Sequence, residues 1–120
     1  MQIITSGSVG IDQGTAILFS HFDTDGEMWS GSGDREVRTP VMFSQTFAKP
    51  PQVITYPCMW DADTMINMRM DIFADTISKD GFEIVFRTWS DSRIARVRAV
   101  WQAIGAIHDD DLWDLASINS

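Results

Sequence analysis

Short stretches in which apolar and polar residues alternate recur along the chain, and they constrain its fold more than any other feature. The clearest is 66–73 (INMRMDIF), where the even positions are apolar and the residues between them are polar. Segment 94–105 (IARVRAVWQAIG) alternates too, with Arg96 and Arg98 opposite small or apolar residues. Successive side chains of a β-strand point to opposite faces, so a period of two predicts strands buried on one face. Alanine and arginine also favour helix, but the alternation and the strand just before this segment favour a hairpin.

Turn-forming residues divide the alternating stretches into six segments of strand length. The predicted strands are 15–20, 36–43, 52–57, 66–73, 82–89 and 94–105. Loops are predicted at 21–36, at the Pro-Pro pair 50–51, at 57–64 and at the Ser-Lys-Asp-Gly turn 78–81. Pro40 lacks a backbone N–H and predicts either an edge position for its strand or a bulge. Strands spaced roughly 10–15 residues apart, without intervening helices, predict an all-β fold, a six-stranded antiparallel β-sandwich.

The chain is acidic, and its acids are unevenly distributed. Of 120 residues, 17 are acidic and 9 are basic, which gives a formal net charge of −8. A domain of this charge repels nucleic-acid backbones, so no nucleic acid partner is expected. Four of the acids lie in 108–120, and without that segment 13 acids and 9 bases remain. We therefore divide the chain into one domain at 1–107 and an acidic C-terminal tail at 108–120.

The hydrophobic content of 44% is that of an ordinary globular domain. No apolar run approaches the roughly 20 residues that a membrane-spanning helix needs, so no membrane insertion is expected. The N-terminal segment 1–14 has the pattern of an extended chain with turns. It contains no basic stretch followed by an apolar one, so no secretory signal is visible.

Residues that could support catalysis or bind a metal are few. One cysteine and two histidines exclude a multi-cysteine zinc site, and no serine or cysteine nucleophile stands in a recognisable motif. Cys58 is expected to be a small buried residue. Asp61 and Asp63 are expected in a solvated loop, with a weakly bound calcium ion at a subunit interface as the alternative. The sequence therefore predicts no enzymatic activity and no cofactor.

Two positions on neighbouring predicted strands are candidates for ligand binding. Arg69 lies in the middle of 66–73, where it either belongs to a solvated strand face, paired with Asp71 or Glu83, or reaches a ligand. Trp89 ends the next strand and either closes the end of the sandwich or forms part of a sugar subsite. An indole offers an apolar face to the C–H groups of a pyranose, while arginine and carboxylates hydrogen-bond its hydroxyls.

Several of these segments together resemble the H-type lectin domain, the family of a snail agglutinin that binds N-acetylgalactosamine and of the C-terminal domain of discoidin. The similarity runs from Phe43 through AKPPQV and NMRMDIF to DGFEIVFRTWSDSRIARVRAVWQAIG, and SGSVGIDQG and MWSGSGDREV upstream resemble bacterial members. It covers roughly residues 3–107. The resemblance implies a β-sandwich that assembles as a homotrimer, lacks catalytic activity and binds galactose-type sugars, with N-acetylgalactosamine foremost.

The resemblance also implies which residues hold the sugar. The binding arginine of the family falls on Arg69, its Trp-x pair falls on Trp89 and Ser90, and Asp34 is the nearest match to its sugar-binding aspartate. Ser90 stands where the snail protein has a histidine, and Ala95 stands where it has a stacking tyrosine from the neighbouring copy in the trimer. These departures from the family pattern put the exact glycan in question.

Loss of the histidine and the tyrosine changes the binding that we expect. Affinity for N-acetylgalactosamine falls or the specificity changes, unless Asp91 or Trp29 compensates. Single sugar sites are weak, and three sites that face one way raise the apparent affinity. The chain is therefore expected to act as a multivalent lectin, outside the cell or in a secreted or phage-type particle.

Charged side chains are expected on an outer sheet face. Arg87, Arg96 and Arg98, with Glu83 among them, fall on the polar sides of their strands, which predicts one charged face. In a trimer that face forms ion pairs between subunits, and in a monomer it is a soluble surface. A second hypothesis is a structural trimerisation or attachment module without a sugar ligand, in a phage tail or a cell-surface assembly. The acidic tail, with Trp113, is then the docking element.

Overall fold

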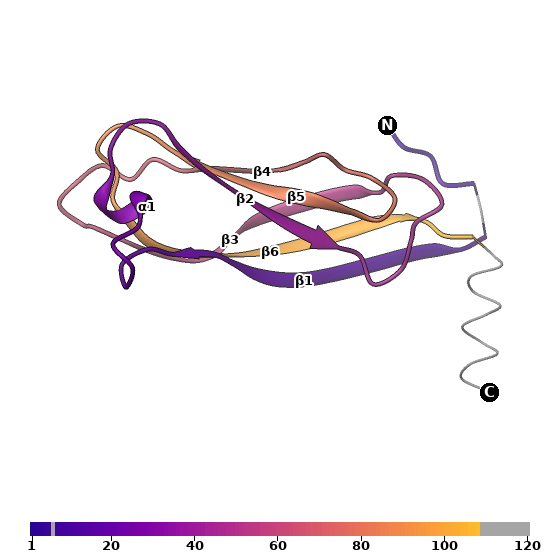
Figure 1. The fold of residues 1–120 in the computed structure, drawn as a ribbon. Helices are drawn as coiled ribbons and strands as arrows, with labels where there is room; N and C mark the ends of the chain where they lie inside the picture. Colours follow the sequence, from indigo (N-terminus) through magenta and orange to yellow (C-terminus); the bar gives the residue numbers. More distant parts are fainter. Residues whose placement is uncertain (6, 109–120) are drawn as a thin grey trace.

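The computed structural model describes residues 1–5 and 7–108, which form two antiparallel sheets of three strands each (Figure 1). The first sheet, in the order β1-β6-β3, consists of β1 (Val9–Ser20), β6 (Ile94–Ala106) and β3 (Gln52–Ala62). The second, in the order β2-β5-β4, consists of β2 (Arg35–Met42), β5 (Gly81–Thr88) and β4 (Asp71–Asp75). The sheets pack face to face, so the prediction of a six-stranded antiparallel β-sandwich is confirmed.

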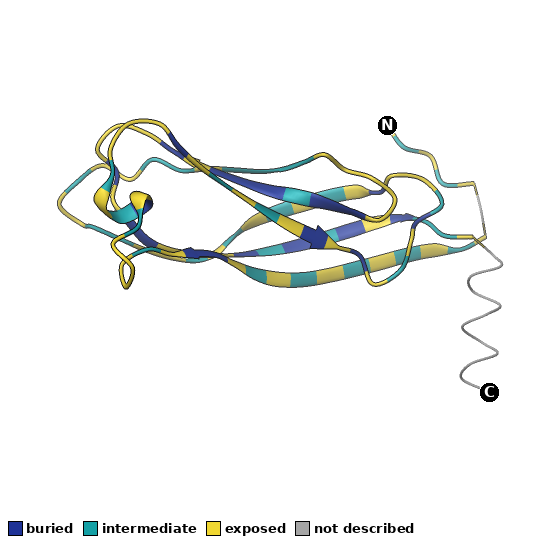
Figure 2. Ribbon diagram, in the orientation of Figure 1, coloured by how far each residue is buried: buried dark blue, intermediate teal, exposed yellow. Residues whose placement is uncertain are grey.

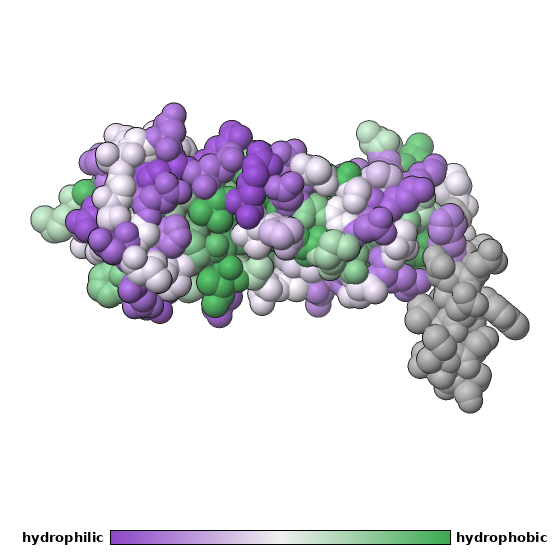
Figure 3. Space-filling model, viewed as in Figure 1, coloured by the Kyte–Doolittle hydropathy of each residue, from purple (hydrophilic) through white to green (hydrophobic). Residues whose placement is uncertain are grey.

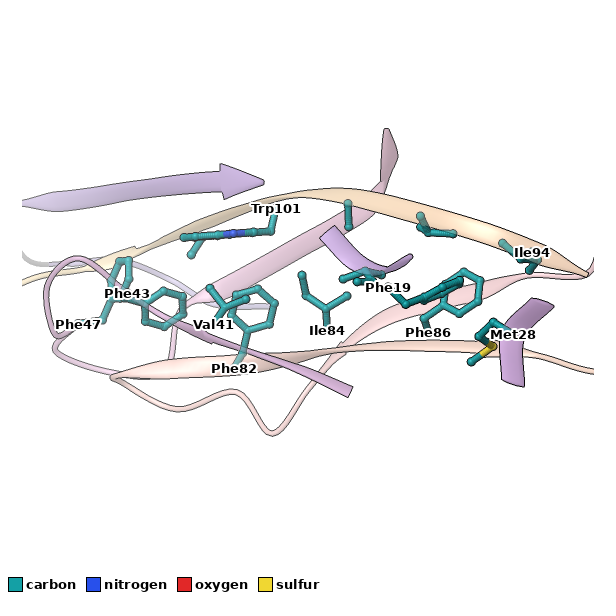
Figure 4. Packing of buried hydrophobic residues seen from close by; sticks show 14 residues of the cluster. Phe19, Met28, Val41, Phe43, Phe47, Phe82, Ile84, Phe86, Ile94 and Trp101 are labelled. Carbon is teal, nitrogen blue, oxygen red and sulfur yellow. The ribbon is translucent and has the colours of Figure 1, made fainter. Parts of the chain in front are cut away.

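The core lies between the sheets and is built around the two central strands, β5 and β6 (Figures 2 and 4). Strand β6 turns its alanines and Trp101 inward, and β5 turns Phe82, Ile84 and Phe86 inward. Small alanines on one strand leave room for the aromatic rings that come from the other sheet. The ring centroids of Phe82 and Trp101 are 5.6 Å apart, and those of Phe86 and Phe19 are 5.1 Å apart.

The alternation in the last predicted segment is that of a strand. Buried and more exposed residues alternate along β6 from Val97 to Ala103, so the helical alternative for this segment is wrong. The edge position expected from Pro40 is also confirmed, because β2 pairs only with β5. An edge strand has no neighbour on its outer side, so a proline there deprives no neighbouring strand of a hydrogen-bond donor.

The third strand runs farther than predicted, and a bulge in it exposes Cys58. Strand β3 continues through Ala62, so much of the loop predicted at 57–64 is strand. Its partner β6 has 13 residues and pairs with it as far as that end. The register shifts between Pro57 and Met59, which leaves Cys58 as the extra residue of a bulge. Cys58 is exposed, so the expectation that it is buried is wrong.

Two other strand ends differ from the prediction. Strand β4 spans only Asp71–Asp75, so Arg69 lies just before the strand and not in its middle. At Arg69 the backbone forms hydrogen bonds with side-chain hydroxyls. Thr88 Oγ1 donates to the Arg69 carbonyl (2.5 Å), and the Arg69 N–H donates to Ser92 Oγ (2.9 Å). Such bonds compete with a strand ladder. Strand β1 is longer than predicted. It begins at Val9, because the long β6 pairs with it over its whole length.

The charged residues that were predicted to share one outer face lie on two. Glu83 and Arg87 belong to β5, whereas Arg96 and Arg98 belong to β6, so the two pairs lie in different sheets. The prediction of one charged face is therefore wrong. A period of two indicates which side chains point away from the core, but it does not say to which sheet a strand belongs.

On the outer face of the second sheet, the charges form a network. Glu36 accepts hydrogen bonds from Arg87 Nε (2.8 Å) and Arg38 Nε (3.1 Å), and Arg38 also contacts Asp75 (3.1 Å) and Glu83 (3.4 Å). The guanidinium groups of Arg87 and then Arg38 lower the pKa of Glu36. Glu36 therefore keeps its charge, and its hold on both arginines, at a lower pH than an isolated glutamate.

The single turn α1 (Glu27–Ser30) lies at one end of the sandwich and is tied to His21. The Met28 N–H donates to His21 Nδ1 (3.2 Å), and Met28 itself is fully buried. Gly26 lies so close to the imidazole that an added Cβ would come within 2.4 Å of it. His21 is thus part of the packing of this loop. No helix in the described ranges is long and apolar enough to cross a membrane.

The packing between β5 and β6 makes a prediction about stability. Ile84 is fully buried at the centre of β5, so Ile84→Ala leaves a cavity and should lower the free energy of unfolding by about 2–5 kcal/mol. Urea unfolding followed by tryptophan fluorescence measures the change. Met42→Ala is the control, because Met42 is 74% exposed and should change stability by no more than about 0.5 kcal/mol. Equal losses in the two variants would contradict this account of the core.

Candidate functional site

Three loops meet at the α1 end of the sandwich because of the way β5 pairs with its neighbours. Arg35, the first residue of β2, lies opposite Thr88, the last residue of β5, and Asp71, the first of β4, lies opposite Arg87. The residues just before β2 and β4 therefore lie beside the turn that follows β5 (Figure 1). These loops contain all five predicted site residues, namely Asp34, Arg69, Trp89, Ser90 and Asp91.

Arg69 forms an ion pair with Asp91 across two of these loops. Its Nη1 donates to Asp91 Oδ1, and the side chain is partly buried. The backbone of Arg69 is held on both sides by the hydroxyls of Thr88 and Ser92. The expectation of pairing with Asp71 or Glu83 is wrong, because Arg69 is not on the strand face that those residues share. The guanidinium is instead fixed at the end of the sandwich, with its remaining N–H groups available.

The turn after β5 places Trp89 on the surface. Ser90 has a positive φ of 61°, which turns the chain away from the strand direction directly after Trp89. The Ser90 carbonyl then accepts a hydrogen bond from the Gly33 N–H (2.9 Å), which fixes the loop before β2 against this turn. Trp89 remains 41% exposed, and Asp34 is exposed and has no ion pair among the described residues. An indole face and a free carboxylate thus stand in adjacent loops.

A pocket of about 360 Å³ lies between the loop before β2, the turn after β5 and the ends of these two strands. Its lining residues are Asp34, Arg35, Glu36, Arg87, Thr88 and Trp89. Figure 3 shows hydrophilic side chains around this end of the molecule, with an apolar strip exposed between β2 and β1. The pocket combines an apolar aromatic face with a carboxylate and guanidinium donors. Such a combination suits a ligand that carries many hydroxyl groups around an apolar patch.

Two of the five predicted site residues line the pocket, and three do not. Asp34 and Trp89 form part of its wall, whereas Arg69, Ser90 and Asp91 lie in the neighbouring loops. Sequence reasoning did not identify Glu36, Arg87 or Arg35 as pocket residues. For the first two a signal was present, since both are polar residues at strand ends next to Asp34 and Trp89.

Arg35 is the residue that joins the two sides of the pocket. It is only 6% exposed, and it donates hydrogen bonds to four backbone carbonyls and no carboxylate. Those acceptors belong to Gly33 (2.9 Å), Glu27 (3.2 Å), Met28 (3.3 Å) and Ser90 (3.1 Å). The planar guanidinium can reach all four because its donors point in several fixed directions. Arg35 thereby connects α1, the loop before β2 and the turn after β5.

Neither Trp29, which was considered as a compensating residue, nor Ala95, which stands in place of the family's tyrosine, contributes to the pocket. The Trp29 ring is covered by the Arg93 guanidinium, 4.5 Å from the ring centroid, and packs edge-on against Phe22 at 5.1 Å. Trp29 is not among the residues that line the pocket. Ala95 is buried in the core. The stacking surface in this pocket is therefore Trp89 alone.

Asp61 and Asp63 each form an ion pair with an arginine. Asp61 lies in β3, not in a loop, and contacts Arg96 (3.2 Å), while Asp63 contacts Arg93 (3.5 Å). Within residues 1–5 and 7–108, no group of three or more histidine, cysteine or acidic side chains is arranged to hold a metal ion.

The role of Arg35 can be tested through stability. Arg35→Met removes the donor from one buried and three partly buried hydrogen bonds to backbone carbonyls, and we expect it to lower the free energy of unfolding by about 2–3 kcal/mol. Arg35→Lys should recover only part of the loss, because one ammonium cannot reach all four acceptors. Chemical denaturation provides the measurement. Arg38→Met is the matched control and should change stability much less, since exposed ion pairs contribute little. Indistinguishable curves for Arg35→Met and Arg38→Met would show that Arg35 is not the joining residue.

Comparisons with known proteins agree with this architecture. Residues 38–104 match the family model of the H-type lectin domain. A protein of Fuscovulum blasticum named ATP synthase subunits region ORF 7 is 52% identical over 108 residues, which are 90% of this chain and 94% of that protein. One of the discoidin-1 subunits of Dictyostelium discoideum is 34% identical over 71 residues, which are 58% of this chain and 28% of the discoidin-1 polypeptide.

Among solved structures, wild-type discoidin II of Dictyostelium discoideum has a TM-score of 0.74 at 21% identity. The match covers 88% of this chain and 40% of the discoidin II chain. The tailspike protein gp49 of Pseudomonas phage LKA1 gives a TM-score of 0.51 at 17% identity, over 84% of this chain and 15% of the tailspike. At these identities the structures show a shared fold. The match of the family model over residues 38–104, more than half of the chain, establishes that the chain belongs to the H-type lectin domain family.

Proposed function

We propose that this domain is a non-catalytic lectin that binds glycans containing galactose or N-acetylgalactosamine in the pocket at the α1 end. The observation that carries the proposal is the exposed indole of Trp89 beside the free carboxylate of Asp34 in one pocket of an H-type lectin domain. The indole packs against the C–H face of the sugar ring, and the carboxylate accepts hydrogen bonds from its hydroxyls.

Arg69, Ser90 and Asp91 complete the proposed site from the adjoining loops. The ion pair with Asp91 fixes the Arg69 guanidinium, whose free N–H groups donate to sugar oxygens. Ser90 offers a hydroxyl at the turn that carries Trp89. Ser90 has a shorter reach than the histidine of the snail protein, and the buried Ala95 cannot stack on a sugar, so we expect weak binding at a single site.

A direct binding experiment tests the sugar site. Calorimetry with N-acetylgalactosamine and galactose should detect binding to the wild type, and Arg69→Ala and Trp89→Ala should each weaken it at least about tenfold, or about 1.4 kcal/mol. Lys79→Met is the control, because Lys79 lies in the β4–β5 turn at the opposite end. A glycan array without hits, together with no heat of binding, would sink the proposal. If Arg69→Ala unfolds the chain, Arg69 is structural, and Trp89→Ala decides the question.

We further propose that the domain forms a homotrimer through the outer face of the first sheet. Three adjacent strands expose large apolar side chains there, namely Ile11 and Ile17 of β1, Ile104 of β6, and Ile54 and Tyr56 of β3. Ile11 and Ile104 are direct cross-strand neighbours. Adjacent exposed apolar side chains of this kind are typical of a surface that contacts another protein. Three joined copies also supply the multivalency that a weak sugar site requires.

The oligomeric state has its own test. Sedimentation equilibrium should give a mass three times that of the 13.5 kDa chain. Ile54→Asp places a charge on the proposed interface and should produce monomers that retain the single-site sugar affinity but bind a glycan-coated surface much less tightly. Met42→Asp, an equally drastic change in the other sheet, should leave the trimer intact. A wild-type mass of one chain contradicts the trimer.

An attachment or assembly module without a sugar ligand is the second candidate. It is favoured by one observation, that the exposed apolar face of the first sheet does not include the pocket and would serve assembly alone. The proposed docking element at Trp113 lies outside the described residues. Deletion of 108–120 separates the candidates: loss of assembly with retained sugar binding supports a lectin with an accessory tail.

A further inference from the structure

Arg87 occupies a position in the pocket wall that the family resemblance does not explain. It is the second-last residue of β5, it lies directly opposite Glu36 of β2, and its side chain is 49% exposed. Arg87 and Trp89 are two positions apart and both line the pocket. The sugar that packs on the indole would therefore lie within the surroundings of this guanidinium.

Two contacts hold Arg87 before any ligand arrives. Its Nε donates to Glu36 Oε1 (2.8 Å), and its guanidinium carbon lies 5.0 Å from the centroid of the Phe73 ring. Glu36 is itself fixed by Arg38 (3.1 Å), which is anchored in turn by Asp75 (3.1 Å). A side chain fixed in this way loses little conformational entropy when it binds.

The bond through Nε leaves both terminal nitrogens of Arg87 without a hydrogen-bond partner among the described residues. A guanidinium only donates hydrogen bonds, so these nitrogens require an oxygen acceptor from the ligand. Ser90 offers its hydroxyl from the adjoining turn and is not part of the wall that Arg87 lines. Arg35 also lines the pocket, but it donates to backbone carbonyls, so Arg87 is the guanidinium of the lining with both terminal nitrogens available.

The charge balance around Arg87 decides which acceptor it takes. Arg87 and Arg38 share three acids, Glu36, Asp75 and Glu83, so the network already has one more negative than positive charge. In the wall, Asp34 adds a carboxylate and Arg35 adds a guanidinium, so the excess of one negative charge remains. An anionic ligand finds no excess positive charge here, whereas a neutral oxygen can accept from the arginine without repulsion.

We propose that Arg87 contacts the ligand and sets the specificity of the site for sugars with a neutral acceptor oxygen, such as an acetamido carbonyl or a hydroxyl, over sugars with a carboxylate. This inference rests on the proposed sugar-binding function. It adds to that function a ligand contact, Arg87, and a preference between neutral and acidic sugars.

Calorimetry with three sugars tests the inference. The wild type should bind N-acetylgalactosamine and galactose, and galacturonic acid no more tightly than galactose. Arg87→Met should weaken N-acetylgalactosamine binding about tenfold, and Arg87→Gln, which keeps an N–H donor on a shorter side chain, should weaken it less. Circular dichroism confirms that both variants fold, as expected for an exposed position.

Two control variants separate a contact from an indirect effect. Lys79→Met removes the same charge at the opposite end of the sandwich and should bind like the wild type. Arg38→Met also breaks a bond to Glu36, but Arg38 does not line the pocket, so its loss of affinity should be smaller than that of Arg87→Met. An equal or greater loss in Arg38→Met overturns the assignment of Arg87 as the contact.

The outcomes also distinguish this inference from the proposed function. If the wild type and Lys79→Met bind none of the three sugars, the proposed function fails and this inference fails with it. If the wild type binds N-acetylgalactosamine and Arg87→Met binds it equally well, only the role of Arg87 is overturned. Tighter binding of galacturonic acid than of galactose overturns the preference for neutral sugars.

Discussion

The packing of β5 against β6 is the constraint on which the rest of the structure depends. Each is the central strand of its sheet, so each has a paired neighbour on both sides and one face turned to the other sheet. Alanines on β6 and aromatic rings on β5 fill the space between them, and neither set could do so alone. Because β5 pairs with both β2 and β4, its end at Thr88 also determines where the loops before those strands lie. The pocket is therefore a consequence of where the central strand stops.

The two outer faces of the sandwich differ in chemistry, and this difference separates two tasks. The outer face of the second sheet carries the network around Glu36 and Arg38, and the pocket opens where that network meets the loops. The outer face of the first sheet exposes isoleucine and tyrosine side chains beside Arg96 and Arg98. Charged groups fixed by one another suit the recognition of hydroxyls, while an apolar face suits contact between protein copies.

Much of the fold could be predicted because alternation is a local property of the chain. The inward residues of β5 and β6, and the edge position of Pro40, follow from single segments. What could not be predicted depends on partners distant in sequence. The backbone of Arg69 follows the same alternation as β4, yet the hydroxyls of Thr88 and Ser92 draw it out of the sheet.

The candidate site was predictable to a similar extent and for similar reasons. The five predicted residues come together at one end of the sandwich because antiparallel pairing places their loops there. Arg35 could not be recognised as buried from its sequence, since its acceptors are backbone carbonyls that carry no sequence signal. The division of the arginines between two faces was missed because strand order within a sheet is set by the whole fold.

The location of the pocket bears on how weak sites can be combined. The pocket lies at the end of the sandwich, beside the outer face of the second sheet, whereas the apolar face belongs to the first sheet. Association through the first sheet would therefore leave the pocket open to solvent. Copies joined side by side about a rotation axis would carry their α1 ends in the same direction, so that one glycan-coated surface could meet several pockets at once. Under those conditions the effective concentration of the second and third sites compensates for the modest contacts that each pocket makes.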